Sequence, residues 1–309
     1  MRLVEPPERE IQPHRMRRRL ADGLTIAALA GLAMAVVHRL VLLIGPAQYD
    51  LANMDFWFQA DTPRVFQNVT SRWSNHYRTS AHPLFSIFQF AADHAVARVV
   101  RGPQLAVVPW LVAFEAALWV ASLFLLLKIV GLKRLDAAVF TVMASSTAAA
   151  MFWLPTLETH TLASITMIWV MALAARLARL GARDRHLLAA NLLSMSMTVP
   201  HWIAGVLVTF AHRKWTRALQ VVANALVLAV ALWTVQKLLM PSAGFFLGER
   251  GDFKYVSVPT PRHLIQGVFN FVANPIVLPR VAHDAQTGAL TVEHAGPLTA
   301  SWPGKIALL

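Results

Sequence analysis

The chain has 309 residues, of which 56% are hydrophobic and only 14% are charged, and its mean hydropathy is +0.50. A soluble domain carries roughly 25% charged residues, so this composition predicts an all-α polytopic membrane protein whose first partner is the lipid bilayer. The sequence contains no cysteine, which excludes disulfides and thiolate chemistry.

The distribution of the net charge of +12 argues against a nucleic-acid partner. Basic residues recur in four short clusters between apolar runs, at 15–19, 128–134, 176–185 and 213–217. The positive-inside rule produces this spacing, because cytoplasmic loops retain Lys and Arg beside anionic headgroups. We therefore expect the N-terminus and all four clusters on the cytoplasmic side of a bacterial inner membrane.

A spanning helix needs about 20 mostly apolar residues. The predicted spans are 20–45, 105–130, 137–154, 162–180 and 218–240. Pro200 interrupts the run 187–211, and one crossing there would place the basic residues 212–214 outside. We therefore expect two short helices in a hairpin with an outward tip, which gives about seven transmembrane helices in a single domain over 1–309. Residues 305–309 resemble the opening of another span, which suggests a truncated chain.

Two long loops, 46–104 and 241–305, then lie on the extracytoplasmic side. Within the first, the segment 84–100 carries polar residues near helical spacing and apolar residues on the other side. Its polar positions include Ser86, Gln89, Asp93, Arg98 and Arg101. This pattern predicts an amphipathic helix that lies in the membrane interface rather than crossing it.

The first loop also carries the most plausible chemistry, centred on Asp61. Asp61 precedes a predicted short interfacial helix over 62–74, whose first turn contains Pro63. One interpretation makes Asp61 or Thr62 the N-cap of this helix. The other makes Asp61 a general base held at the membrane surface. The competing carboxylates of this loop are Asp50 and Asp55.

Histidines and one glutamate mark the other predicted outer segments. His82 either precedes a helix that Pro83 starts, or contacts a phosphate or an acceptor. His201, at the hairpin tip, either donates to a phosphate oxygen or is an ordinary interfacial histidine. Glu158 and His160 form only a weak metal motif, because their spacing does not place them on one helical face.

Two ionisable residues lie within predicted spans, Arg39 in the first and Glu115 in the second. An ionisable group in a membrane is costly and usually has a partner in the bundle interior. We expect Arg39 and Glu115 to form a structural ion pair. A proton or ion pathway is the alternative, although one acid and one base do not make a relay.

The order of these features over 45–215 resembles the GT-C superfamily of integral-membrane glycosyltransferases. Asp61 matches the acidic residue that begins a juxtamembrane helix in that family. The segment 82–84 matches a His/Lys-Pro-Pro-Leu-like motif with one proline missing, and 155–160 looks like the acidic patch after the third span. The segment 199–202 lies where many members place a lysine or another phosphate-contacting residue, and here it carries a histidine.

The resemblance implies transfer of a sugar from a polyprenyl-phosphate donor to an acceptor on the extracytoplasmic face. Asp61 would be the general base, with Asp55 as the fallback, and a divalent metal is an optional cofactor with Glu158 and His160 as weak candidates. The groups that would contact substrate or phosphate are Arg64, Arg78, His82, His201, Arg250 and Lys254.

Two other function classes remain open from the sequence. One is a non-catalytic membrane scaffold with the same architecture. The other is a transporter or flippase of lipid-linked glycans, which would favour broken helices at the bilayer midplane and inverted repeats.

The charge pattern generates a test of topology. Cysteines introduced at Ser74 and Ser257 of this cysteine-free chain should react with a membrane-impermeant thiol reagent in intact cells, because both positions lie in predicted outer loops. Labelling that requires cell lysis would contradict the arrangement.

Overall fold

The computed structural model describes residues 13–53, 60–246, 260–261, 265, 268, 280–283 and 290–293. These residues are helical except for connecting loops and one antiparallel ribbon. In that ribbon β1 (Arg280–His283) pairs with β2 (Leu290–Glu293). The all-helical character predicted for the membrane part is thus confirmed for the described chain.

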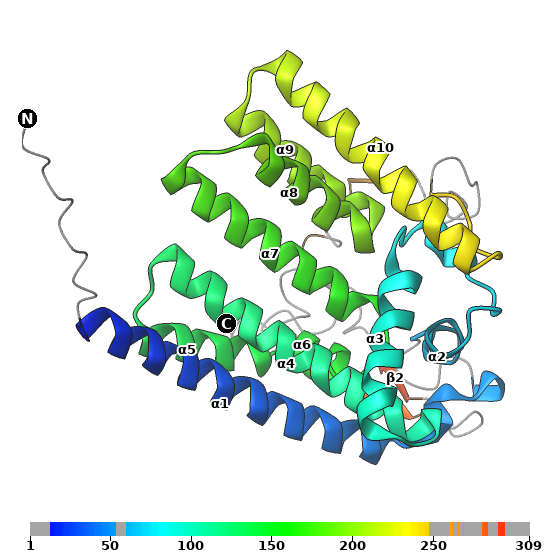
Figure 1. Ribbon diagram of the computed structural model, residues 1–309. Coiled ribbons are helices and arrows are strands. Elements are labelled where there is room, and N and C mark those ends of the chain that lie inside the picture. The colour runs from blue at the N-terminus through cyan, green and yellow to red at the C-terminus, as the bar shows by residue number, and fades with distance from the viewer. Residues whose placement is uncertain are drawn as a thin grey trace, which may run out of the picture.

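Four long helices lie in one row, as Figure 1 shows from the bottom of the view upwards. They are α1 (Pro13–Ile44), α4 (Gln104–Val130), α7 (Thr159–Leu180) and α10 (Trp215–Leu239). Helix α4 is the most buried of the four and packs on both α1 and α7. The main core, which includes Val41, Val108 and Leu111, lies between α1 and α4 and continues to the residues before α7.

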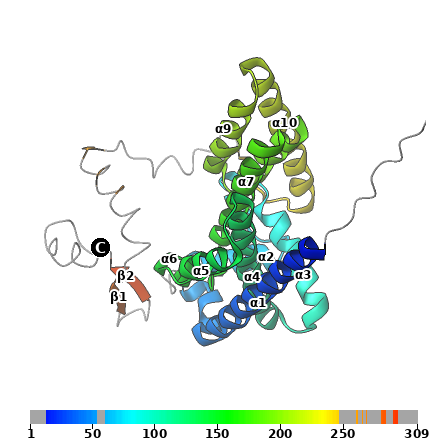
Figure 2. The ribbon, with the colours of Figure 1, turned by 90° about the vertical axis from the view of Figure 1, so that its left-hand side faces the viewer.

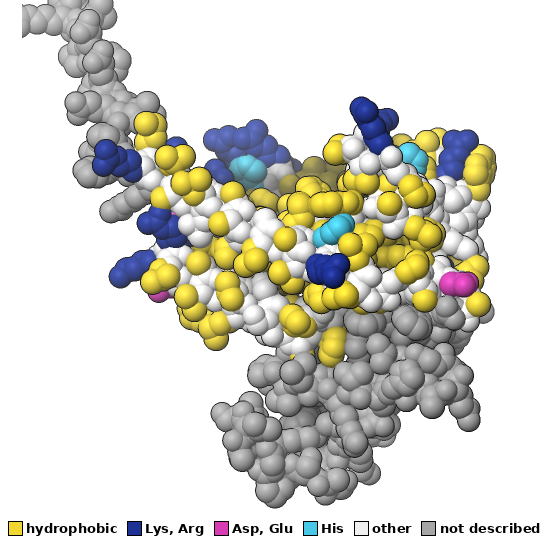
Figure 3. All heavy atoms as spheres, turned by 90° about the horizontal axis from the view of Figure 1, so that it is seen from below, with side chains coloured by type: hydrophobic (Ala, Val, Ile, Leu, Met, Phe, Trp, Pro, Cys, Tyr) yellow, Lys and Arg dark blue, Asp and Glu magenta, His cyan; other side chains and the backbone are white. Residues whose placement is uncertain are grey.

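All four helices are long and apolar enough to cross a membrane, and no other helix among the described residues meets both criteria. Large hydrophobic side chains are exposed along α1 and α10, including Leu32 and Leu238. Seen from the α1 side, hydrophobic side chains are spread across the described part of the face, and many Lys and Arg side chains lie towards its edges (Figure 3). This surface suits a membrane protein.

The bundle has two distinct ends. At the first, named here the arginine-rich end, Arg179 Nη2 donates to the carbonyl of Val130 (2.7 Å) and Arg213 Nε binds Asp184 Oδ1 (2.7 Å). The opposite, loop end carries α2 (Thr62–Thr70) and α3 (Phe85–Val100). Helix α3 runs across the row of long helices at this end (Figure 1), which is the arrangement expected of an interfacial helix.

The segment predicted as one span over 137–154 is instead two helices, α5 (Arg134–Ser145) and α6 (Ala148–Trp153). The interruption follows from three consecutive hydroxyl residues. Ser145 and Ser146 donate to the carbonyls of Thr141 (2.8 Å) and Val142 (2.9 Å), while Thr147 accepts from the amide of Ala150 and caps α6. Side-chain hydroxyls that satisfy the backbone locally permit a break at this depth.

The run 187–211 is broken as predicted. Helix α8 (Asp184–Met197) and helix α9 (Trp202–His212) form a hairpin around the short 3-10 turn Val199–His201. The buried amide of Asn191 holds the two helices together. It donates to Thr209 Oγ1 (2.7 Å) and accepts from Trp202 Nε1 (2.9 Å).

Within the described residues, the chain passes between the two ends in seven segments: α1, α4, α5–α6, α7, α8, α9 and α10. Figure 2 shows the same row from its side. Only four of the seven are single helices of spanning length. The predicted count of seven crossings is therefore not confirmed by helix length.

Helix α3 has the predicted bounds, but its polar side faces the protein. Ser86, Gln89 and Asp93 are buried, with exposed fractions of 1%, 0% and 0%. The outward side exposes Phe88 and Val99 together with His94 and Arg98. Polar side chains buried against the protein, with both apolar and basic side chains exposed, are compatible with a helix at a membrane interface.

Gly205 generates a stability test, because a Cβ there would lie 2.5 Å from Ser194 Oγ and 2.6 Å from the Asn191 Cα. Gly205→Ala should destabilise the protein by on the order of 1–3 kcal/mol, measured as a lower thermal unfolding midpoint in detergent. Gly31→Ala is the matched control, since nothing lies within 4 Å of its Cβ position. Equal midpoints for the two variants would contradict the close packing of α8 on α9.

Candidate functional site

Asp61 lies at the N-cap position of α2, and its backbone carbonyl accepts from the amides of Arg64 and Val65 (3.0 Å each). Its carboxylate, however, makes no capping hydrogen bond. Pro63 occupies the first turn, as predicted. The side chain of Asp61 is therefore available for another role, and the capping interpretation does not account for it.

Two arginines hold the Asp61 carboxylate. Arg78 Nη2 lies 2.5 Å from Asp61 Oδ2, and Arg64 Nη1 lies 3.5 Å from the same oxygen. Arg64 also bonds the Tyr77 hydroxyl and places its guanidinium 5.3 Å from the Tyr77 ring centroid. Burial would lower the pKa of Arg78, but Asp61, Tyr77 and Glu158 together outweigh burial and raise it. The Arg78 guanidinium is thus fixed as a cation beside the carboxylate.

Glu158 joins this cluster to the bundle. Its Oε1 accepts from the Asp61 amide (2.8 Å), and its Oε2 accepts from the Thr159 amide (3.0 Å) at the start of α7. The side chain is 3% exposed, so both hydrogen bonds are shielded from water. Glu158 is therefore a helix cap and a tether. With both oxygens used, it is a poor metal ligand.

The loop that supplies Arg78 is anchored by His76, whose side chain is completely buried. Its Nε2 lies 3.0 Å from the Ser71 carbonyl oxygen, and its Nδ1 lies 3.0 Å from Ser86 Oγ. Because a carbonyl only accepts, Nε2 carries the proton and Nδ1 accepts from Ser86. Burial lowers the pKa of His76 despite its backbone contacts, so the ring is held neutral.

Helix α10 clamps the same loop from the other side. Gln236 Nε2 donates to the Pro83 carbonyl (2.7 Å), and Gln236 Oε1 accepts from the Ile87 amide (3.0 Å). The segment after α10 adds Ser242 Oγ, which accepts from the His76 amide (3.0 Å). Gln236 and Ser242 thus help to fix the loop that carries Arg78, although both are far from Arg78 in sequence.

The histidines predicted as substrate contacts lie at the hairpin tip. His82 Nδ1 lies 2.7 Å from the Met197 carbonyl oxygen, so it donates to the tip. His201 has a buried Nδ1 without a hydrogen-bond partner in the described chain. Burial and the nearby His160 both lower the pKa of His201. The structure thus places His160 close enough to His201 for an electrostatic interaction, which the sequence did not indicate.

A cavity of about 310 Å³ opens beside His160. Its wall includes Trp119, Trp153, His160 and Ser164. The ring of His160 lies 4.5 Å from that of Trp153, centroid to centroid, and Trp119 Nε1 donates to Ser164 Oγ (2.8 Å). His160 follows Glu158 by two residues, and Glu158 is the residue that bonds the Asp61 amide.

The predicted ion pair between Arg39 and Glu115 is wrong. Arg39 is exposed on α1 and makes no ion pair within the described residues, whereas Glu115 is 3% exposed inside α4. The polar neighbour of Glu115 is Gln89 of α3. The physical reason is that Arg39 lies on the exposed side of α1, whereas Glu115 lies on the buried side of α4.

Three predicted site residues, Asp55, Arg250 and Lys254, lie outside the described residues. Among the described residues, no group of three or more His, Asp or Glu side chains is arranged to hold a metal ion. The described site is therefore the cluster of Asp61, Arg64, Arg78, Tyr77 and Glu158.

Comparison with protein-family models, curated proteins and solved structures gave no match for this chain.

His76 generates a pH test. Its pKa is lower in the folded protein than the value of about 6.5 in an unfolded chain, so the unfolded chain binds the proton first as the pH falls. Its contribution to stability is complete above about pH 6.5 and is lost as the pH drops towards the folded-state pKa. His76→Gln should therefore flatten the dependence of the unfolding midpoint on pH between about pH 7.5 and 5.5. Parallel curves for the variant and the unmodified chain would show that His76 is not the titrating group.

Proposed function

We propose that this chain is a membrane glycosyltransferase that transfers a sugar from a polyprenyl-phosphate donor to an acceptor, with Asp61 as the general base. One observation carries the proposal. The partly exposed Asp61 carboxylate stands at the start of an interfacial helix, makes no capping bond and lies between two guanidinium groups.

In this proposal the loop end faces the extracytoplasmic side of the bacterial inner membrane. Basic residues concentrated at the opposite end support that orientation, because cytoplasmic loops retain Lys and Arg. The seven segments between the two ends then each cross the membrane, with α5–α6 crossing as a broken helix. This arrangement is what the resemblance to the GT-C superfamily implies.

The reaction needs a base and a cation in one place. The oxygen of an acceptor hydroxyl attacks the anomeric carbon, and its proton passes to an Asp61 oxygen. The bond between the anomeric carbon and the phosphate oxygen breaks, and the phosphate leaves with the electron pair. Arg64 and Arg78 are positioned to stabilise the charge of that leaving group.

The ion pair between Asp61 and Arg78 has a consequence for this mechanism. While Arg78 occupies Asp61 Oδ2, that oxygen is not free to take a proton from an acceptor hydroxyl. An anionic donor phosphate competes for the same guanidinium group, so donor binding would release the carboxylate when the acceptor needs it. The aromatic and hydroxyl groups of the cavity beside His160 provide a surface that suits a sugar ring.

The closed charge balance of the cluster favours one alternative, a non-catalytic scaffold. Asp61, Glu158, Arg64 and Arg78 carry two negative and two positive charges that are already paired or tethered. Such a cluster can serve to fasten α2 and the loop before α3 onto α7 without any chemistry. Transport has weaker support. Of the features that a transporter would use, the broken helix α5–α6 is the one that the described residues offer.

The test is sugar transfer in membranes supplied with lipid-linked sugars. Asp61→Asn should lower transfer by at least about 100-fold, the usual size of a general-base contribution, and Asp61→Glu should be poorly tolerated because the reach changes. Asp50→Asn is the matched control, because Asp50 is an exposed carboxylate in the same loop that accepts from the Ala52 amide (2.9 Å).

Asp55→Asn is run in parallel. Loss of transfer with Asp55→Asn but not with Asp61→Asn would move the base to Asp55. Full transfer by both variants would support the scaffold instead. A thermal unfolding midpoint close to that of the unmodified protein separates loss of chemistry from loss of folding.

A further inference from the structure

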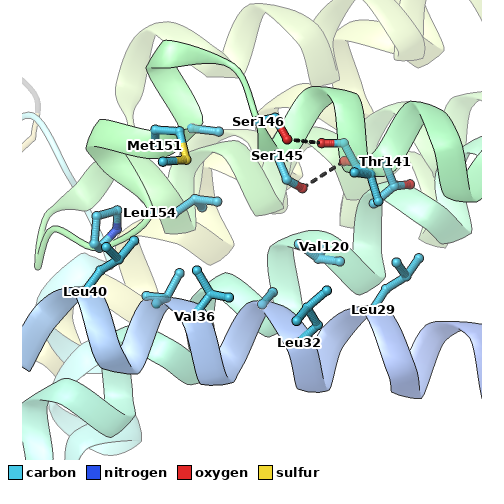
Figure 4. A pocket seen from close by; sticks show the side chains of 15 residues that line it. Leu29, Leu32, Val36, Leu40, Val120, Thr141, Ser145, Ser146, Met151 and Leu154 are labelled. Carbon is cyan, nitrogen blue, oxygen red and sulfur yellow. Dashed lines mark hydrogen bonds between the residues drawn. The ribbon is translucent and has the colours of Figure 1, made fainter.

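A shallow apolar groove of about 210 Å³ lies between α1 and the broken helix α5–α6. Figure 4 shows Leu29, Leu32, Val36 and Leu40 of α1 facing Met151 and Leu154 across it. The few hydroxyl groups of its wall are already bonded to backbone carbonyls, as Ser145 and Ser146 are. The groove therefore offers an occupant dispersion contacts and no free polar group.

The length and depth of the groove match one leaflet of a bilayer. From Leu29 to Leu40 the α1 axis rises about 17 Å at 1.5 Å per residue. Half of a bilayer's hydrocarbon core is about 15 Å. Because the candidate span is Arg19–Ile44, this stretch covers its half nearer the loop end. The groove can therefore take one hydrocarbon chain from the leaflet on that side.

Arg39 marks where the polar end of such a lipid would lie. It follows Leu32 by seven residues and Val36 by three, so the three side chains share one edge of α1. Leu32 and Val36 are 61% and 47% exposed, which makes this the lipid-facing edge of the groove. Arg39 is exposed and without an ion pair in the described chain, about five residues before the end of α1. From there its long side chain reaches the headgroup region.

We propose that the groove between α1 and α5–α6 binds an anionic phospholipid of the bilayer, with one acyl chain in the groove and the phosphate on Arg39. The apolar groove has the length of one leaflet and suits one acyl chain. The Arg39 guanidinium, which has no ion pair in the described chain, suits a negatively charged headgroup. This site is separate from the Asp61 cluster and does not depend on sugar transfer.

The experiment uses the full chain in phosphatidylcholine vesicles that contain a phosphatidylglycerol with a photoreactive diazirine on its acyl chain. After illumination, mass spectrometry locates the cross-linked peptides. We expect cross-links within 29–40 and 141–155. Arg39→Gln should lower this labelling about tenfold, equal to the loss of one charge-assisted contact, and Arg98→Gln is the control for charge.

Filling the groove gives a second variant that does not alter charge. Ala33 lines the groove, whereas Ala35 is exposed and is not part of its wall. Ala33→Phe should therefore reduce labelling at least as much as Arg39→Gln, and Ala35→Phe should leave it within about twofold. Both variants introduce the same bulk on the same helix.

Three results would overturn the proposal. The first is equal labelling of the exposed face of α10, which would mean ordinary surrounding lipid. The second is equal labelling by the Ala33→Phe and Ala35→Phe variants. The third is displacement of the phosphatidylglycerol probe by equimolar polyprenyl phosphate, which would assign the groove to a lipid-linked donor. None of these depends on whether Asp61 is catalytic.

Discussion

The structure of the loop end depends on two hydrogen bonds that the Glu158 carboxylate accepts. One carboxylate oxygen caps α7 and the other fixes the backbone of Asp61 at the start of α2. With 3% exposure, this carboxylate is held by two amides rather than by water. Removing it would leave two buried N–H donors without partners, at a cost of roughly 1–3 kcal/mol each. The geometry of Asp61 and its arginines thus depends on a residue 97 positions away.

The sequence predicted helix positions well because apolar run length and basic flanks are local signals. Helices α4 and α10 begin and end within a few residues of the predicted spans, and Pro200 marks the hairpin correctly. The break between α5 and α6 was missed, since three hydroxyl residues in an apolar run do not interrupt its hydropathy. They act through bonds to preceding carbonyls, which only a structure displays.

The site was predicted only in part, because sequence shows local signals but not contacts between distant segments. Asp61 and the two arginines share one loop, so sequence proximity suggested them. Glu158 was noticed for metal binding, but its real partner is an amide on a distant loop. The ion pair of Arg39 with Glu115 failed because charge complementarity says nothing about which side of a helix faces lipid. Arg39 lies on the exposed side of α1 and Glu115 on the buried side of α4, and periodicity alone cannot distinguish the buried side from the exposed side of a helix in lipid.

The α8–α9 hairpin has a consequence for the membrane itself. Helix α9 has 11 residues and is about 17 Å long, far short of a hydrocarbon core of about 30 Å. Its Ile203 and Leu207 are 65% and 63% exposed, as is usual for apolar side chains that contact lipid. If α9 crosses the membrane as proposed, lipids beside it would have to shorten or tilt their chains. The bilayer along that flank would then be thinner than elsewhere, and its headgroups would lie closer to the hairpin tip.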